Sequence, residues 1–570
     1  MTLIITLFLI FNFFLLKKLF INLFKRNIII ISILINIIFL FISYSINIDE
    51  KFYIYYSTSV LSLNLSIYIS LIIDHIKHYL NKTRLEKINK FIDKYGIYFL
   101  LLIFFILINY ITFSKHLNFS SNAFDLGIFD QVAWKYSNFD FPPSSSIRMI
   151  DNILGDHFKP ILFIYGLLYN IYPSPLILIF LQNLFFILGA YGIYKIINHK
   201  INNPLIGILF IILYLSFIGN INALLFDFHP MVIAVSMFPW LFYFSITKKW
   251  LYFYLLIIPI LFTKENMSLY IMFFGIYQFL FQKERIKGSI TFLIGVIYFY
   301  FVMNVFIPYM GGTGKSYWSY DLIGNNPKEL IINTIIHPIN FLNVIFSEPQ
   351  KIITYLHYLG SGLLFAINPI IILLIPSFAQ KFLSTRQEFW GLNFHYSIDV
   401  YWVIIIGIIY FLFLIKKKYN KNYKEIWIII VTFIFINSLT INIYNNPLSY
   451  INYNLENKKT LLSILKIIGP NDSVSAQNTI VPHLSHRERI YVFPIVQDSE
   501  YIILNTKVKD TDLWPFNSRL EYNNYILRIS NKEDAIEPLQ RPIFRKIAKI
   551  NNKYQLIKYE EGILLFKKIH

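Results

Sequence analysis

The run GIYFLLLIFFILINYITF, residues 96–113, contains no charged side chain. As a helix, about 20 mostly apolar residues cross the hydrocarbon core of a bilayer. Comparable runs lie near residues 2–20, 27–46, 53–74, 175–198, 203–220, 231–247, 250–263, 266–282, 288–308, 399–416 and 426–444. Residues 351–381 are apolar but interrupted by glycines and prolines, which predicts two short or broken helices there. Together these runs predict a polytopic α-helical membrane protein with about fourteen transmembrane helices.

The composition supports a membrane protein and argues against a nucleic-acid-binding one. Of the 570 residues, 56% are hydrophobic and only 15% are charged, whereas soluble proteins average about 25% charged residues. The net charge of +19 comes from lysines and arginines clustered between apolar runs, notably in 77–94, 283–287 and 416–424. Such clusters mark cytoplasmic segments. We therefore expect the lipid bilayer as a partner and no nucleic acid. The absence of cysteine excludes disulfide and thiolate chemistry.

Three domains follow from this pattern. Residues 1–94 are expected to be an N-terminal extension of three transmembrane helices, and residues 95–445 the main transmembrane domain, with loops at 114–159 and 309–350. Residues 446–570 are soluble in character and predict a small α/β domain, with one helix at 461–468, short strands at 473–476, 490–493 and 501–504, and a hairpin at 554–566. The positive-inside bias places both loops and the C-terminal domain on the extracytoplasmic face of the cell membrane.

The loop after the first quoted run is dense in reactive side chains. Asp125 directly follows Phe124, and two readings of it stay open: a general base or orienting ligand, or the N-cap of an amphipathic helix lying on the membrane. Asp130 lies five residues further on, about 140° around a helix, so the two carboxylates would not share a face. We assign Asp130 a role in orienting the catalytic loop.

The other candidates lie at the ends of apolar runs. Asp156, His157 and Lys159 could bind a phosphate, whose charge a cation neutralises, although Lys159 could instead extend to lipid headgroups. The pairs Asp227/His229 and Lys264/Glu265 could bind substrate; they could equally be a hydrogen-bonded pair and an ion pair. Asp227 and His229 alone do not complete a metal site. His483 and His486 are interpreted as structural.

Charged groups near the bilayer are costly when scattered. We therefore expect the side chains of Asp125, His157, Asp227 and Glu265 to line one cavity, within about 15 Å of each other.

Four motifs resemble a family of predicted prokaryotic multi-pass membrane proteins of unknown function: residues 124–131 (FDLGIFDQ), 156–160 (DHFKP), 227–230 (DFHP) and 476–487. The resemblance covers roughly residues 95–510. That family is similar in plan to the C-type glycosyltransferases, which use polyprenyl-phosphate-linked sugars and carry a catalytic acidic residue in the first large external loop. Asp125 occupies that position.

The resemblance implies an inverting glycosyltransferase that moves a sugar from a polyprenyl-phosphate donor to a glycan, lipid or protein acceptor of the envelope. Asp125 would deprotonate the acceptor, and Lys159 with His157 would hold the leaving phosphate. No cofactor is certain, and a divalent metal is compatible with these residues. The alternatives are a transporter or lipid flippase, which should show paired halves with corresponding broken helices, and a non-catalytic envelope protein.

Overall fold

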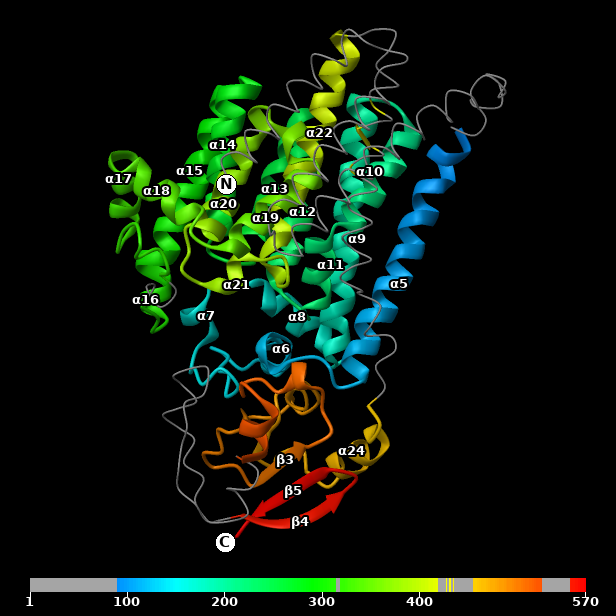
Figure 1. Cartoon of the computed structure of the whole chain (residues 1–570), viewed down its shortest axis with the longest axis vertical. Coiled ribbons are helices and arrows are strands. Elements are labelled where there is room, and N and C mark those ends of the chain that lie inside the picture. Colours follow the sequence, from blue (N-terminus) through cyan, green and yellow to red (C-terminus); the bar gives the residue numbers. More distant parts are fainter. Residues whose placement is uncertain are drawn as a thin grey trace, which may run out of the picture.

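A computed structural model describes residues 90–313, 318–418, 427, 430–431, 434, 455–524 and 554–569. It shows a helical body and, at one end of it, a small sheet formed by the C-terminal part of the chain (Figure 1). The three helices expected in residues 1–94 lie outside the described residues, apart from residues 90–94, and so does most of the run expected at 426–444.

Within the described ranges, four helices are long and apolar enough to cross a membrane: Lys94–Leu117, Pro175–Lys200, Arg285–Tyr309 and His395–Lys418. They contain α5 (Ile97–Leu117), α9 (Pro175–Lys200), α15 (Arg285–Phe301) and α22 (Ile398–Lys418). A fifth candidate is α10 (Pro204–Ser216) with α11 (Ile218–Leu225), which meet at a bend of 50°. These residues make the chain a helical membrane protein with four or five candidate spans.

Shorter apolar helices fill the body between the long ones. They are α8 (Ile161–Tyr169), α12 (Pro230–Ile246), α13 (Trp250–Leu261) and α14 (Met267–Tyr277). Several helices begin where expected because a capping side chain precedes a proline. Ser174 and Asn203 each accept a backbone N–H in the first turn, ahead of Pro175 and Pro204.

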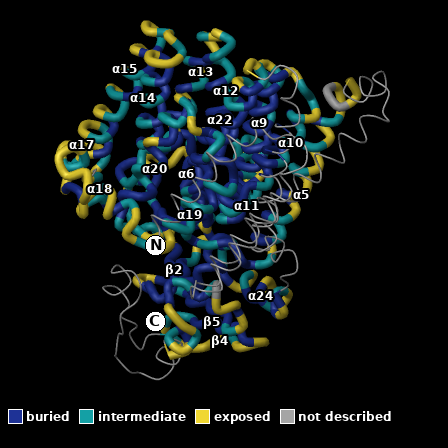
Figure 2. Tube along the Cα trace, turned by 45° about the horizontal axis from the view of Figure 1, so that its top comes forward, coloured by how far each residue is buried: buried dark blue, intermediate teal, exposed yellow. Residues whose placement is uncertain are grey.

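Burial separates central from peripheral helices. In α22, 78% of the most apolar 18-residue window is buried inside the protein, against 22% in α15. Figure 2 shows α22 and α9 largely dark blue, while α17 (Pro327–Ile336) at the edge is yellow. Helix α22 is therefore the centre of the body, and α15 presents an apolar face outward, as a lipid-facing helix does.

The interrupted stretch near 351–381 consists of short pieces, as expected: α19 (Pro349–Gly360), η5 (Leu363–Ala366), η6 (Pro369–Leu374) and α20 (Ile375–Phe382). The expectation of a loop over 309–350 was wrong in part. This region contains α17 (Pro327–Ile336) and α18 (Pro338–Ile345). Asn326 accepts the Glu329 N–H at 3.0 Å, and prolines occupy the first turns of both helices, so the helix-start signals were present in the sequence.

The C-terminal part is α/β, as expected. Helix α24 (Lys458–Leu465) precedes a five-stranded sheet of order β2-β1-β3-β5-β4. Its strands are β1 (Val474–Ala476), β2 (Ile490–Val492), β3 (Tyr501–Asn505), β4 (Tyr554–Glu560) and β5 (Ile563–Lys568). Strand β1 pairs in parallel with β2 and β3, whereas β5 is antiparallel to β3 and β4.

The segment between β1 and β2 docks on the helical body. It contacts η2 (Ala123–Gly127) and α6 (Ile128–Ser137), which lie between the body and the sheet (Figure 1). Asn478 Nδ2 donates to Asn122 Oδ1 at 2.7 Å, and Gln131 Nε2 donates to the Arg487 carbonyl at 2.9 Å. The expected membrane-surface helix after Asp125 is therefore wrong: eight of the ten residues of α6 are buried, because α8 packs on one side of it and the C-terminal part on another.

Candidate active site

A cavity of about 1770 Å³ lies beside η2 and α7 (Ile153–Asp156). Much of its wall is apolar and comes from α14, α15, α17, α18 and α20. The charged and imidazole side chains on the wall are Asp125, Arg148, Asp156, His157, Lys159, His229, Lys264, Glu265, Arg386, Glu388 and His395. Seven of the nine side chains proposed from the sequence therefore meet at one cavity. Asp130 and Asp227 are not among its lining residues in the described part of the chain.

Asp125 lies within η2 and caps no helix. The N-cap of η2 is Asn122 and that of α6 is Gly127, neither with a side-chain cap bond, so the capping interpretation of Asp125 was wrong. Among the described residues, no group donates a hydrogen bond to its carboxylate, which faces the cavity. Burial raises the pKa of Asp125, whereas the nearby Lys159 and Lys264 lower it. An under-coordinated carboxylate beside two cations is suited to bind a ligand group.

His157 and Glu265 form a close pair across the cavity wall. The Nδ1 of His157 lies 2.7 Å from Glu265 Oε1, and the Phe158 N–H donates to Glu265 Oε2 at 3.2 Å. Burial lowers the pKa of His157 to about 4. Burial alone would raise the pKa of Glu265, but His157 and Lys264 hold it at about 2. At neutral pH the pair is therefore a neutral imidazole that donates to a carboxylate, and it joins the 157–159 loop to the turn at 264–266.

Lys159 is buried and faces the same cavity. Its side chain lies over the Phe129 ring, with Nζ 4.6 Å from the ring centre. Burial lowers the pKa of Lys159 to about 8; Lys264 acts in the same direction, and Asp156, Asp125 and Glu265 oppose it. Asp156 is also paired with Arg148, at 3.4 Å. Lys159 thus presents a cation that an incoming anion would stabilise.

Asp227 lies away from the cavity, in a network of hydrogen bonds. Lys115 Nζ lies 2.7 Å from its Oδ1, and the Asn122 N–H donates to its Oδ2 at 2.9 Å. Gln182 Nε2 donates to the Asp227 carbonyl at 2.8 Å, and the His229 N–H donates to Gln182 Oε1 at 2.7 Å. These bonds hold the 227–229 loop against the start of η2 and aim His229 at the cavity.

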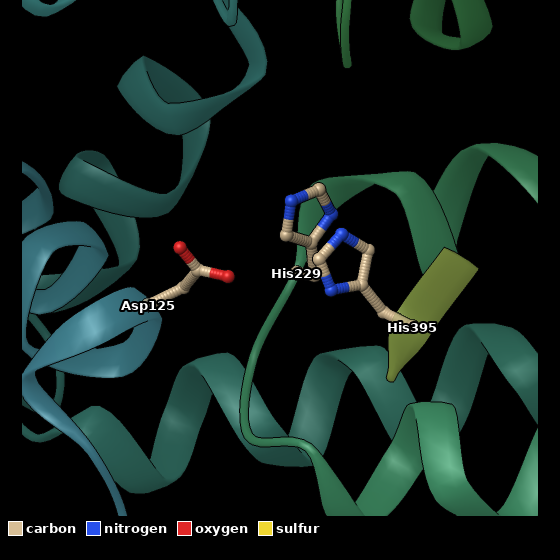
Figure 3. Close-up of side chains that lie close together, drawn as sticks. All are labelled: Asp125, His229 and His395. Atoms are coloured by element: carbon tan, nitrogen blue, oxygen red, sulfur yellow. The ribbon is translucent and has the colours of Figure 1, made fainter. Parts of the chain in front are cut away.

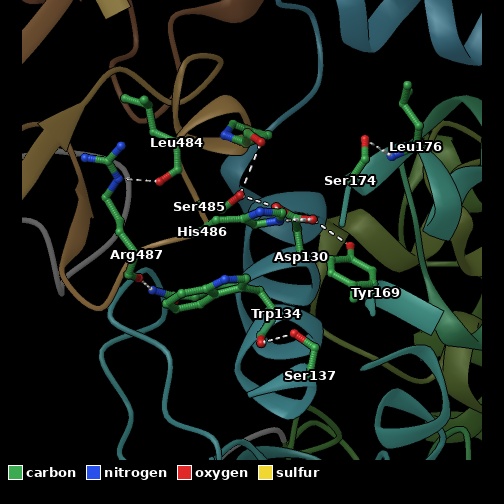
Figure 4. A network of polar contacts seen from close by, with 12 residues as sticks. Asp130, Trp134, Ser137, Tyr169, Ser174, Leu176, Leu484, Ser485, His486 and Arg487 are labelled. Atoms are coloured by element: carbon green, nitrogen blue, oxygen red, sulfur yellow. Dashed lines mark hydrogen bonds and ion pairs between the residues drawn. The ribbon is translucent and has the colours of Figure 1, made fainter. Parts of the chain in front are cut away.

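Asp130 also lies away from the cavity, in a network that joins the body to the C-terminal domain (Figure 4). Its carboxylate accepts from the Tyr169 hydroxyl at 2.6 Å and from the Ser485 hydroxyl, and lies 3.1 Å from His486 Nε2. Its side chain is fully buried. His483, by contrast, stacks on His116 at 4.2 Å between ring centres. The structural interpretation of both histidines fits these contacts.

The sequence interpretation did not include His395. Ligand atoms of Asp125, His229 and His395 all lie within 4.8 Å of one another, and Figure 3 shows the carboxylate pointing toward the two imidazoles. A signal for it existed: Asn393-Phe394-His395 precedes the apolar run of α22 as Asp227-Phe228-His229 precedes that of α12. The second Phe-His pair before a helix marks His395.

The C-terminal domain also contributes to the cavity wall. Asn478 and Trp514 are lining residues, and the Trp514 ring lies 5.0 Å from that of Phe124, edge to face. The cavity is therefore completed by the two parts of the chain together.

Comparison with known proteins identifies the family of the chain. No curated protein matches it. The sequence model of one family, described as "Predicted membrane protein (DUF2079)", matches residues 115–534. This range contains every candidate residue of the site, and because it covers most of the chain, the protein belongs to this family of predicted membrane proteins.

Proposed function

We propose that this protein is a membrane glycosyltransferase of the C-type plan, which moves a sugar from a polyprenyl-phosphate donor to an envelope acceptor. The proposal includes about fourteen transmembrane helices, residues 1–94 as an extension, 95–445 as the catalytic membrane domain and 446–570 as an extracytoplasmic domain. The cavity then opens on the extracytoplasmic face of the cell membrane.

The observation that carries the proposal is that the cavity wall has a charged end and a largely apolar remainder. Lys159, Lys264 and Arg148 lie at the end that holds Asp125. Elsewhere the lining includes apolar side chains of α14, α15 and α17, among them Met272, Phe299 and Ile331. A lipid phosphate needs both features: cations for the charged head and an apolar surface for the chain. The volume also exceeds the roughly 300–1,000 Å³ typical of small-molecule pockets.

The proposed reaction is an inverting displacement. Asp125 takes the proton of the acceptor hydroxyl while that oxygen bonds to the anomeric carbon, and the bond from the carbon to the phosphate oxygen breaks. Lys159 and Lys264 neutralise the departing phosphate. His157 is held by Glu265 and keeps the lysine-bearing loop in place. Trp514 and Phe124 offer aromatic faces on which an acceptor sugar can stack.

A lipid flippase is the second candidate, favoured by the 50° bend between α10 and α11 and by the interrupted stretch 349–382.

The experiment that separates the two candidates uses the full chain in nanodiscs with a panel of radiolabelled polyprenyl-phosphate sugars and envelope acceptors. Wild type is compared with Asp125→Asn and with Asp321→Asn, an exposed control. Transfer by wild type and the control, but not by Asp125→Asn, supports the enzyme. Movement of the intact donor across proteoliposomes, with no transfer from any member of the panel, supports the flippase.

A further inference from the structure

We propose that Asp125, His229 and His395 form a binding site for a divalent transition-metal ion of the zinc type. The three side chains come from separate segments, η2, the residue before α12, and η7 (His395–Ser397), and converge on one point of the cavity wall (Figure 3). Their ligand atoms lie within 4.8 Å of one another. Around a tetrahedral ion with bonds of about 2.0–2.1 Å, ligand atoms are roughly 3.4 Å apart, so modest side-chain rotations close the set.

The ring nitrogens of His395 are an independent indication. The residue is 2% exposed, and neither Nδ1 nor Nε2 has a hydrogen-bond partner among the described residues. Buried polar atoms are nearly always satisfied, and leaving them unpaired is costly. A metal ion at the Asp125 carboxylate would satisfy one of these nitrogens.

His229 has to turn to share the ion, because the lone pairs of an imidazole lie in the ring plane and those of two stacked rings point side by side. Its ring stacks on that of His395, with centres 3.7 Å apart and planes 15° from parallel. Its Nδ1 also accepts the Met231 N–H at 3.2 Å. Ligation through Nδ1 uses the lone pair that accepts this hydrogen bond, and ligation through Nε2 places the ring hydrogen on Nδ1. In both cases the 3.2 Å bond from Met231 is lost. A hydrogen bond from His229 to Asp125 would still leave His395 without a partner among the described residues.

The donor set selects the kind of ion. Two imidazoles and one carboxylate suit zinc and its neighbours in the first transition series, whereas Mg²⁺ and Ca²⁺ prefer oxygen ligands. Three protein ligands leave a coordination position open, as in catalytic zinc sites. All three side chains line the cavity, so the open position faces its interior. If the proposed function holds, one Asp125 oxygen would bind the ion while the other accepts the acceptor proton, and a phosphate oxygen of the donor is the ligand that the open position would take.

The test measures the ion without any substrate. The full chain, purified in detergent with its affinity tag removed, is stripped with a chelator and titrated with Co²⁺, whose visible absorption reports the coordination number and geometry of the bound ion. Metal content after equilibration with Zn²⁺ gives the stoichiometry. We expect one ion per chain, and at least a 10–100-fold weaker affinity (about the loss that even outer-shell changes cause) in His395→Ala and Asp125→Asn.

His337→Ala is the matched control, because His337 is exposed on the protein surface and its loss should leave the affinity unchanged. Asp125→Asn preserves side-chain size and keeps the test valid if His395→Ala fails to fold. No stoichiometric Co²⁺ band in wild type, or a band unchanged in folded His395→Ala or Asp125→Asn, overturns the metal site. Failure of sugar transfer by a metal-loaded protein would instead count against the proposed function alone.

Discussion

Two aspartates five residues apart face opposite sides of one short segment. Asp130 is fully buried, and three side chains from α8 and the C-terminal domain satisfy its carboxylate. Asp125 faces the cavity and receives no hydrogen bond from the described residues. A satisfied buried carboxylate stabilises the fold, whereas an unsatisfied one beside cations marks a site for a ligand. The difference separates a residue that joins two domains from one available for chemistry.

Among the tests of this difference between the two aspartates, the largest effect is expected at Asp125. Replacement by Asn keeps the size but removes the negative charge, so sugar transfer should fall by about 10²–10⁴-fold, the contribution of a general base. The melting temperature in detergent should change little, because the carboxylate makes no bond that the fold needs. A large loss of thermal stability with transfer retained would assign Asp125 to the structure instead.

Asp130 should behave in the opposite way. In Asp130→Ala the Tyr169 and Ser485 hydroxyls and His486 lose their acceptor, and leaving a buried donor unsatisfied costs about 1–3 kcal/mol. We expect a lower melting temperature and faster proteolysis of the C-terminal domain. Asp140→Ala, at an exposed carboxylate just after α6, serves as the control. A variant as stable as wild type but inactive would show that Asp130 takes part in the chemistry.

Lys159 tests whether the cavity binds an anion. Lys159→Ala removes a charge-assisted contact worth about 1.5–3 kcal/mol. The apparent KM for the lipid-phosphate donor should therefore rise by about 10–100-fold. Lys328→Ala removes an exposed cation from α17 and should leave the KM unchanged. An unchanged KM in Lys159→Ala as well would mean that the phosphate lies elsewhere.

The smallest expected effect is a pH dependence of donor binding. The pKa of Lys159 is lowered to about 8 by burial, so the side chain is charged below that pH and loses its charge above it. Donor binding should weaken several-fold from pH 7 to pH 9, since a neutral amine no longer attracts phosphate.

The charged and titratable groups around Lys159 are Lys264, Asp156, Asp125, Glu265, His157, His229 and His395. Lys159→Arg, which stays charged throughout this range, should remove the pH dependence. If the Arg variant keeps the same profile, another of these groups causes it.

Helices were predictable from the sequence and contacts between segments were not. The apolar runs at 175–198 and 399–416 became α9 and α22 nearly residue for residue, because span length and capping residues are local signals. Asp227 shows how a contact between distant segments escapes prediction. Its proximity to His229 suggested a ligand pair, but its partner is Lys115, 112 positions away. His395 was missed because its sequence signal, a repeated Phe-His pair, carries no distance: the folded helices bring it to His229, 3.7 Å away between ring centres.

The order of the strands bears on how the protein is made. Strand β5 pairs with both β3 and β4, although it is translated last of the five. The sheet that carries Asn478 on its loop is therefore unfinished until residue 568 leaves the ribosome, long after the helices that hold Asp125 have been synthesised. Asn478 and Trp514 line the cavity, so its wall is incomplete until this part of the chain has been made. The wall of this cavity is thus completed late in biosynthesis, after the segment that holds Asp125.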